Sequence, residues 1–298
     1  MKKKSILFKL LGVVGACLAA VLMIVGAVIM LIQYQNRVVD MQNEQLASIA
    51  ENVATMTELV TREYINDLES LSSTSAFTEA DDALTRGNSE VMSRFIDSYY
   101  YKKKGILGGI FLTDPTGKEL VGTTDFPAVI YSYSMGDTDT GVSVVVREDE
   151  GRNCYLELSV ETENQNRLIY LLDARELYAQ TAAHTKVGDK GYVMIKDNNG
   201  RIIMHPVEDQ IGIDVLEDRK KSHPDFDFSD LEVLIAKQNS GQSGIERYNS
   251  YWWADEVPRR VEKISAYTPA WVGDGFLVIS AVMDYEEIAG RCEAALSV

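Results

Sequence analysis

The chain has 298 residues, of which 46% are hydrophobic and 25% are charged, a composition that excludes a disordered protein. This length is enough for one large domain or two small ones. The formal net charge is −16, and a surface this acidic repels nucleic acid and anionic lipid headgroups, so nucleic acid is not an expected partner.

The N-terminal segment has the features of a membrane anchor. Residues 10–32 contain no charged side chain and are long enough to cross a bilayer as a helix. Four lysines lie in residues 1–9, and the positive-inside rule keeps them in the cytoplasm. A cleaved signal peptide is the alternative, but its apolar core would be shorter and followed by a small-residue cleavage site. We therefore predict a single span at the cell membrane, with the bulk of the chain extracytoplasmic.

Residues 33–75 contain no Pro or Gly, and their apolar residues recur every three or four positions, as on one face of a helix. These residues are Leu46, Ile49, Val53, Met56, Val60, Tyr64, Leu68 and Leu71. The pattern predicts a stem helix that reaches about 60 Å from the membrane. Its stripe can pack against its own lobes or form a parallel homodimer seam. We expect it to do both.

Two hairpins of the same plan occur in the chain, at 109–120 and 191–206. In each, an apolar strand leads into a turn and a return strand follows, and the turns are Asp114-Pro-Thr-Gly117 and Asp197-Asn-Asn-Gly200. Asp and Asn hydrogen-bond their own backbone in such turns, and Gly takes a positive φ without steric cost. A strand–Asp-x-x-Gly–strand unit that occurs twice predicts two related lobes.

The second hairpin reads Gly-Tyr-Val-Met-Ile-Lys-Asp-Asn-Asn-Gly-Arg-Ile-Ile-Met-His-Pro. This order resembles the membrane-proximal lobe of the double Cache (dCache) sensor family, and the resemblance covers roughly residues 34–290. Members are extracytoplasmic ligand-binding modules of bacterial chemoreceptors, histidine kinases and diguanylate cyclases. The resemblance implies an α+β fold with an N-terminal transmembrane helix, a long stem helix and two PAS-like antiparallel-sheet lobes.

The expected organisation follows from this resemblance. It comprises a cytoplasmic N-terminus at 1–9, a transmembrane helix at 10–32, a stem helix at 33–75, a membrane-distal PAS-like lobe at 76–187, a membrane-proximal PAS-like lobe at 188–283 and a closing helix toward the membrane at 284–298. In complete family members a second span and a signalling domain follow, whereas this sequence ends at Val298. We expect either the sensory part of a longer receptor or a single-span sensor that signals through a partner.

Patterning places further elements inside the lobes. The distal lobe is expected to hold a helix at 85–101, strands at 155–160 and 168–172, and a helix at 174–184 with Asp173 as its N-cap. The proximal lobe is expected to hold a polar loop up to residue 230, a helix at 231–237, and strands at 250–253, 260–267 and 276–282.

Catalytic and metal-binding motifs find little support. Gly241-Gln-Ser-Gly244 lacks the spacing of a nucleophile elbow, and no P-loop, dinucleotide fingerprint or HExxH motif occurs. The acidic segment 137–148 mimics part of a calcium loop, but Val142 replaces the glycine that the sharp turn requires. His205, before a proline at a strand end, is expected to be structural. We predict a protein that is not an enzyme and that has no cofactor or metal.

The resemblance also suggests a ligand site. Many amino-acid-binding dCache members carry an Arg-x-Trp-Tyr run, a further Tyr and an Asp at the end of the last strand of the distal lobe. Asp173 occupies that last position, and Tyr131 and Tyr133 fall where aromatic contacts are expected. The Arg-x-Trp-Tyr run is absent, so we predict a small polar or cationic ligand rather than a free α-amino acid. The alternative is that Asp173 only caps a helix and the tyrosines only pack.

Other aromatic and sulfur-containing residues have structural interpretations. Tyr251, Trp252, Trp253 and Trp271 are expected to pack the proximal core rather than to form a ligand cage. Cys154 and Cys292 are expected to be two buried thiols, although an oxidising exterior would allow a disulfide.

The function predicted from the sequence is an extracytoplasmic small-molecule sensor domain of a membrane-bound signal-transduction receptor of the histidine kinase, diguanylate cyclase or chemoreceptor type. The alternatives are a pilin-like structural subunit and a membrane-anchored hydrolase. A pilin does not need a second lobe and carries an acidic residue near the start of its apolar segment, which this chain lacks. For a hydrolase, no nucleophile–base pair can be named.

Overall fold

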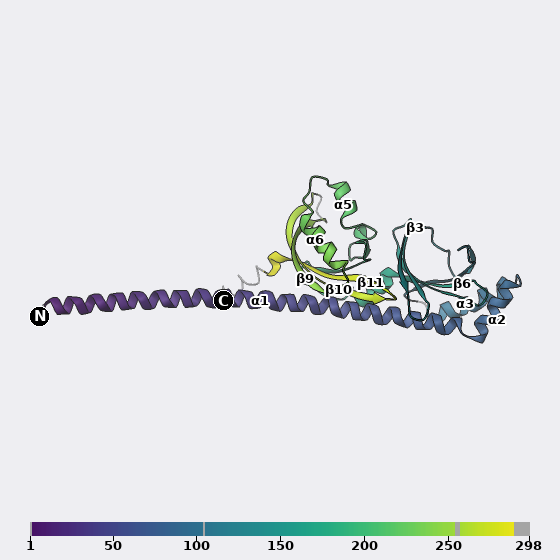
Figure 1. Cartoon of the computed structure of the whole chain (residues 1–298), viewed down its shortest axis with the longest axis horizontal. Coiled ribbons are helices and arrows are strands. Elements are labelled where there is room, and N and C mark those ends of the chain that lie inside the picture. Colours follow the sequence, from purple (N-terminus) through teal and green to yellow (C-terminus); the bar gives the residue numbers. More distant parts are fainter. Residues whose placement is uncertain (1, 104, 254–256, 289–298) are drawn as a thin grey trace. The chain divides into compact units, whose positions relative to one another are not determined.

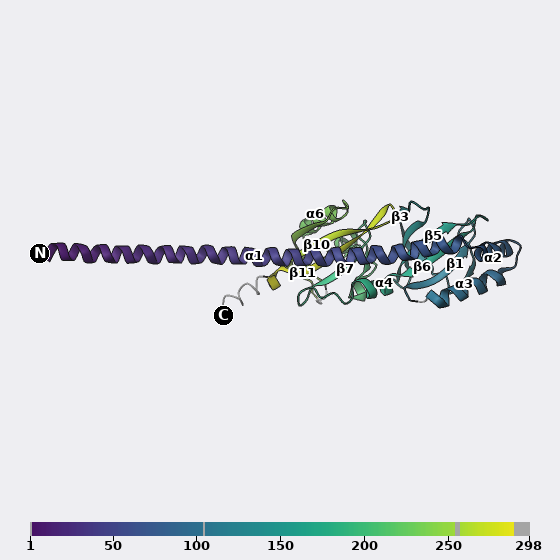
Figure 2. The same ribbon diagram turned by 90° about the horizontal axis from the view of Figure 1, so that it is seen from below.

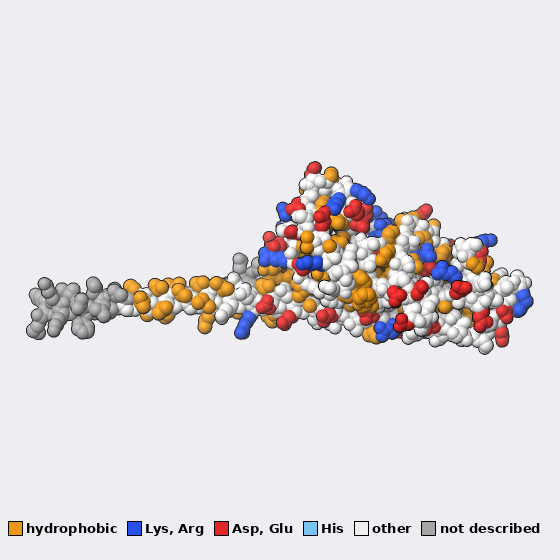
Figure 3. Space-filling model, in the orientation of Figure 1, with side chains coloured by type: hydrophobic (Ala, Val, Ile, Leu, Met, Phe, Trp, Pro, Cys, Tyr) orange, Lys and Arg blue, Asp and Glu red, His pale blue; other side chains and the backbone are white. Residues whose placement is uncertain are grey.

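One continuous helix, α1 (Lys2–Ser72), combines the predicted membrane span and the predicted stem (Figure 1). The computed structural model describes residues 2–103, 105–253 and 257–288. Within them, α1 is the one helix long and apolar enough to cross a membrane, with a mean hydropathy of 2.4 over its best window. Most of its large apolar side chains between Leu18 and Ile32 are exposed, as the visible face in Figure 3 shows. Lipid would cover such a surface.

From Leu46 onward, α1 packs against both lobes, and Figure 2 shows this part of the helix running along both sheets. The predicted stripe is correct at its ends but not in its middle, where Met56 is exposed and Thr57 and Thr61 are buried. The Thr57 hydroxyl donates to the Val53 carbonyl at 2.8 Å, so its polar group is satisfied inside the helix. A pattern built on apolar residues alone overlooks such threonines.

Two short helices follow α1, α2 (Ser75–Thr85) and α3 (Ser89–Lys103). The predicted helix at 85–101 corresponds to α3, but Thr85 itself ends α2. The Thr74 side chain accepts a hydrogen bond from the Phe77 amide and so caps α2, the helix that the sequence patterning did not assign.

The distal lobe is built on a six-stranded antiparallel sheet with the order β2-β1-β6-β5-β4-β3. Its strands are β1 (Leu107–Thr113), β2 (Glu119–Gly122), β3 (Val129–Asp137), β4 (Ser143–Asp149), β5 (Cys154–Glu161) and β6 (Arg167–Asp173). The predicted strands at 155–160 and 168–172 are confirmed as β5 and β6, and β6 is central. The sequence patterning did not assign β3 and β4. Helix α4 (Ala174–Thr181) follows β6 directly.

The proximal lobe is built on a five-stranded antiparallel sheet with the order β8-β7-β11-β10-β9. Its strands are β7 (Tyr192–Lys196), β8 (Ile202–Met204), β9 (Gly244–Trp252), β10 (Arg259–Val272) and β11 (Gly275–Asp284), and its helices are η1 (Glu208–Gln210), α5 (Glu217–Ser222) and α6 (Ser229–Gln238). Side chains of α6 pack on β9, β10 and β11 in one buried apolar cluster.

Most proximal elements confirm the prediction, although β9 begins at Gly244 rather than at residue 250 and β10 extends to Val272 rather than to residue 267. Two further segments also differ. The expected polar loop before residue 230 contains α5, whose buried Arg219 gives it an inner face. The expected closing helix at 284–298 begins one residue late, because β11 includes Asp284, and residues 285–288 form its first turn. Residues 289–298, and with them Cys292, lie outside the described residues.

The internal repeat is confirmed. The two sheets share one strand order, except that the distal sheet adds β3 at its edge. In both hairpin turns the first aspartate accepts hydrogen bonds from the amides two and four residues later, at 2.8 and 3.0 Å for Asp114 and at 3.0 and 2.9 Å for Asp197. Gly117 and Gly200 close the turns with φ of 85° and 98°. The same local chemistry therefore produces the same turn twice.

Candidate ligand-binding site

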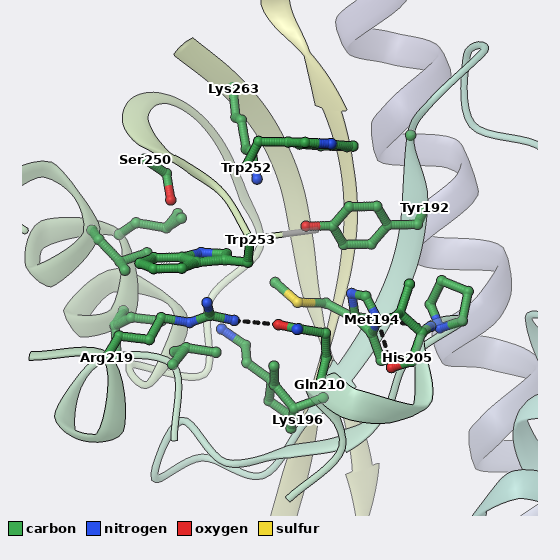
Figure 4. Close-up of a pocket in the computed structure, with 18 of the residues that line it drawn as sticks. Tyr192, Met194, Lys196, His205, Gln210, Arg219, Ser250, Trp252, Trp253 and Lys263 are labelled. Carbon is green, nitrogen blue, oxygen red and sulfur yellow. Dashed lines mark hydrogen bonds between the residues drawn. The ribbon is translucent and has the colours of Figure 1, made fainter. Parts of the chain in front are cut away.

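A cavity of about 220 Å³ lies in the proximal lobe, between the sheet and helices α5 and α6 (Figure 4). Strand β7 supplies one wall through Tyr192, Met194 and Lys196, which share a face because strand side chains alternate. Other walls come from the ends of β9 and β10 and from apolar side chains of α6. The cavity is small for a ligand site, but it has an apolar lining with a few convergent polar groups.

Arg219 of α5 is a cation that lines this cavity. Its side chain donates to the Gln210 amide oxygen at 2.6 Å, and its guanidinium carbon lies 4.0 Å from the centre of the Trp253 ring. Figure 4 shows the guanidinium beside Trp253, on the cavity side. The residue is buried, and burial lowers the pKa of Arg219 to about 10, which still leaves it charged at neutral pH.

Two buried lysines also line the cavity. The Lys196 ammonium donates to the Gln238 amide oxygen, and the Lys263 ammonium donates to the Tyr251 carbonyl at 3.1 Å and lies 4.7 Å from the Trp252 ring centre. Burial lowers the pKa of Lys196 to about 7 and that of Lys263 to about 8. Both lysines can therefore gain or lose a proton near neutral pH.

His205, which the sequence analysis expected to be structural, lines the same cavity. Its Nδ1 accepts a hydrogen bond from the Val207 amide at 3.0 Å, and its ring packs edge-on against Tyr192 with centroids 4.7 Å apart. Burial lowers the pKa of His205 to about 4, so the ring is neutral. Nδ1 also lies 3.2 Å from the carbonyl oxygen of Val207, so both backbone groups of that residue face this nitrogen.

The aromatic residues of the proximal lobe divide into three groups. Tyr251 is buried in the core, as expected, and stacks on Phe226 with centroids 4.2 Å apart. Trp252 and Trp253 line the cavity instead of only filling the core. Trp271 is 49% exposed, so the prediction of core packing is wrong for this residue.

Asp173, the first predicted site residue, ends β6 and caps α4. Its carboxylate accepts from the amides of Arg175 at 2.8 Å and Glu176 at 3.4 Å. The cavity beside it measures about 10 Å³, room for at most a water molecule. These contacts agree with the alternative interpretation, in which Asp173 caps a helix.

Tyr131 and Tyr133 lie on β3, at the far edge of the distal sheet from β6. Three strand spacings separate them from Asp173, or about 14 Å. The Tyr131 hydroxyl donates to Asp197 of the proximal lobe at 2.5 Å, and its ring lies 4.3 Å from the guanidinium carbon of Arg201. Tyr133 is partly exposed. The structure does not bring the three predicted residues together, and their joint role in binding stays a prediction.

The corresponding face of the distal sheet is filled by its own side chains. Phe111 is fully buried and meets Phe126 edge-on with centroids 4.8 Å apart, and Ile169 and Leu171 pack in the same cluster. Cys154 in the same sheet is a buried free thiol, as predicted, and burial raises its pKa to about 12. Among the described residues no group of His, Cys, Asp and Glu side chains could hold a metal ion.

The sequence patterning did not identify Lys196, Arg219 and Lys263 as site residues. One signal was available, because Lys196 sits two and four positions after Met194 and Tyr192 and so on the inner face of a buried strand. Arg219 and Lys263 carried no such signal, since their burial depends on contacts between segments far apart in the chain.

Comparison with known proteins shows which solved structures share this fold. No family model matches the chain, and no curated protein matches it. Among solved structures, the extracellular domain of a histidine kinase, vpHK1S-Z8, is similar with a TM-score of 0.59 and 14% identity over 85% of this chain and 97% of that one. The domain of a sensory box/GGDEF family protein from Vibrio parahaemolyticus gives 0.51 and 14%, over 83% and 99%.

A third similar structure is the ligand-binding domain of the amino acid chemoreceptor PctB from Pseudomonas aeruginosa PAO1, in complex with L-Gln. Its TM-score is 0.51 at 13% identity, over 85% of this chain and 98% of that one. At such identities the likeness concerns the fold. The chain has the two-lobed fold of extracellular sensor domains, the fold that the dCache resemblance implied.

Proposed function

We propose that this chain is the extracytoplasmic sensor domain of a membrane-bound signal-transduction receptor, and that its ligand occupies the proximal cavity. The observation that carries the proposal is the cavity itself, in which an apolar lining and three buried cations converge on one space. Proteins rarely bury charged groups without a partner, so such a place is a default ligand site.

The hairpin turn after β7 offers a route for the signal. Lys196 lines the cavity, and the next residue, Asp197, accepts a hydrogen bond from Tyr131 of the distal lobe. Arg201 ends the same turn and donates to the buried Glu148 of β4 at 2.6 Å. A ligand that shifts β7 would therefore change contacts between the lobes. Shifts of about 1–2 Å are enough in such elements, provided that the ligand binds one arrangement better.

Exposed apolar side chains on the stem helix support the proposal that the receptor acts as a homodimer. Met56 and Leu59, three positions apart, are exposed on the helix while its other face packs on the lobes. A second copy would cover this apolar surface in a parallel arrangement. The apolar segment at 10–32 would hold both copies in the same membrane, as part of a receptor of the histidine kinase, diguanylate cyclase or chemoreceptor type.

A second candidate position for the ligand is the distal lobe, at Tyr131, Tyr133 and Asp173, as the dCache resemblance implies. It would need the lobe to open, since Phe111 and Phe126 occupy the sheet face. The two positions predict loss of ligand affinity in different variants, at Trp253 for the proximal cavity and at Asp173 for the distal lobe.

The test is an unbiased metabolite thermal-shift screen of the full chain in detergent, followed by titration of the hits. Trp253→Ala removes a wall of the cavity, and Trp271→Ala, at an exposed tryptophan outside it, is the matched control. We expect hits that lose affinity in the first variant and keep it in the second. Hits lost in Asp173→Asn but not in Trp253→Ala would place the ligand in the distal lobe, and no hit at all would contradict a small-molecule sensor.

A further inference from the structure

We propose that the proximal cavity binds a small organic carboxylate with an apolar or aromatic body, and not an α-amino acid or a cation. This inference rests on the proposed function, because it names the ligand class of the same cavity. It reverses the charge that the sequence analysis expected for the ligand.

The first argument is the charge of the lining. Lys196 on β7, Arg219 on α5 and Lys263 on β10 come from three separate elements and meet at one space. None of the described residues that line the cavity is Asp or Glu. In a chain with a net charge of −16, three cations gathered at a cavity whose described lining has no carboxylate do not follow from composition. Such a lining attracts an anion and repels an ammonium group.

The second argument is the hydrogen-bonding capacity of these cations. An ammonium has three N–H groups and a guanidinium has five. Within the described residues, each of the three cations has a single hydrogen-bond acceptor, which is an amide or carbonyl oxygen and not a carboxylate. Most of their N–H groups are therefore available to a ligand. A carboxylate offers several acceptor positions to such donors, and its bonds to them are charge-assisted.

Among the described residues, nearby acids form no ion pair with the cations. Asp197 and Asp214 influence Lys196 electrostatically, Asp284 influences Lys263, and Asp218 influences Arg219. The carboxylate of each aspartate accepts hydrogen bonds from other groups, namely a tyrosine or backbone amides. Within the described residues, no ion pair joins any of the four to Lys196, Lys263 or Arg219. A bound carboxylate would supply the missing counter-charge at close range.

The third argument concerns the body of the ligand. Trp252, Trp253, Tyr192 and Met194 line the cavity, and Figure 4 shows them around one space, together with apolar side chains of α6. These surfaces favour an apolar or aromatic body next to the acidic group. An α-amino acid would additionally place its ammonium among described lining residues that include no carboxylate, which is costly. A carboxylic acid without an amine fits both requirements.

The experiment compares acids with their neutral amides on the full chain in detergent, by isothermal titration calorimetry. The probes are benzoate, indole-3-acetate and succinate, each against its amide. We expect at least one acid to bind with a Kd below about 1 mM and its amide to bind at least about tenfold more weakly. Arg219→Met and Lys263→Met should each weaken the acid at least about tenfold.

Arg247→Met is the matched control. Arg247 also lies over an aromatic ring, 3.6 Å from the Tyr285 centroid, and bonds to Glu262, but it does not line the cavity. This variant should bind the acid as the parent does, and circular dichroism should show that all three variants are folded. If Arg219→Met has lost its fold, Arg219→Lys, which keeps the charge, should retain binding and decides the case.

The proposal is overturned if amides bind as well as acids, if the cation variants bind acids like the parent, or if none of the three acids binds. A neutral or cationic hit of the thermal-shift screen that is lost in Trp253→Ala would overturn the carboxylate and leave the proposed site intact. A screen without any hit would instead remove the proposed function.

Discussion

The two lobes share one sheet order but use the same inner face in opposite ways. Counting back from the equivalent turn residues Asp114 and Asp197, Phe111 of the distal lobe corresponds to Met194 of the proximal lobe. Phe111 packs against Phe126 and closes the distal face, whereas Met194 borders an open cavity. At this equivalent position an aromatic side chain packs inside the distal lobe, whereas a flexible one borders the cavity of the proximal lobe.

The charges on the two faces differ at equivalent places. Lys196, one residue before its turn, corresponds to Thr113 in the distal lobe. Lys263 pairs across the sheet with Asp284 at the end of β11, and Tyr155 pairs in the same way with Asp173 at the end of β6. Lys263 therefore corresponds to Tyr155 in the distal lobe. The proximal lobe has a lysine at both places. The comparison teaches that two copies of one fold can differ in whether this face is filled, since the distal face is packed and the proximal face borders a cavity.

The first prediction has the largest expected effect, and it compares how tightly the equivalent faces of the two lobes are packed. Phe111→Ala removes a fully buried ring and should reduce the free energy of unfolding by about 3–5 kcal/mol. Met194→Ala should cost clearly less, because its side chain already borders open space. Denaturant unfolding of the full chain in detergent measures both. Equal losses would show that the proximal face is packed as tightly as the distal one.

The second prediction tests the repeated turn. Gly200→Val and Gly117→Val each place a β-branched residue at a positive φ and should each destabilise by about 1–3 kcal/mol. Gly200→Asn is the control, since Asn tolerates this conformation better than other residues. Melting temperatures of the three variants give the answer. If either valine variant melts with the parent, the two turns are not equivalent in solution.

The third prediction uses the titration of the buried lysines. The pKa of Lys196 is about 7 in the folded state and that of Lys263 is about 8, both below their ordinary value of 10.5. Above these values the unfolded chain binds more protons than the folded chain, so stability rises with pH up to about 10 and this contribution is flat below about 7. We expect a rise of roughly 1–2 kcal/mol between pH 7 and 8 without ligand, and a further rise up to about pH 10.

Lys196→Met should flatten this rise, whereas Thr113→Met, at the equivalent distal position, should leave it unchanged. Thermal unfolding at a series of pH values measures the difference, and identical slopes in the parent and Lys196→Met would contradict the folded-state titration. Carboxylate affinity should fall over the same pH range, because the lysines lose their protons. Asp197 and Asp214 near Lys196, and Arg219 and Asp284 near Lys263, set where in this range the loss occurs.

Much of the fold could be predicted because its signals are local. The Asp-x-x-Gly turns, the long stretch without Pro or Gly, and the cap at Asp173 each depend on residues close in sequence, and all three are present in the structure. The predicted apolar stripe of α1 was wrong at Met56, because the buried residue there is Thr57. A threonine whose hydroxyl is hydrogen-bonded inside the helix can be buried without adding to an apolar pattern.

The candidate site could not be predicted in the same way. It depends on which lobe has an unfilled inner face, and this depends on contacts such as Phe111 with Phe126, whose partners lie 15 positions apart across strand β2. Arg219 and Lys263 read as surface charges, since nothing near them in sequence indicates burial. The dCache resemblance implies a site in the distal lobe, where side chains such as Phe111 and Phe126 fill the equivalent face.

The smallest expected effect separates the two roles of Asp173. Asparagine caps helices about as well as aspartate, so Asp173→Asn should keep the cap of α4, whereas Asp173→Ala should lose about 1 kcal/mol. Neither variant should change the affinity of a ligand that occupies the proximal cavity, which calorimetry with the best acid can check. Because Asp173→Asn removes the charge without removing the cap, a loss of binding in this variant would have no structural explanation. In that case the distal lobe would contain the site, and the roles of the two lobes would be the reverse of those argued from Phe111 and Met194.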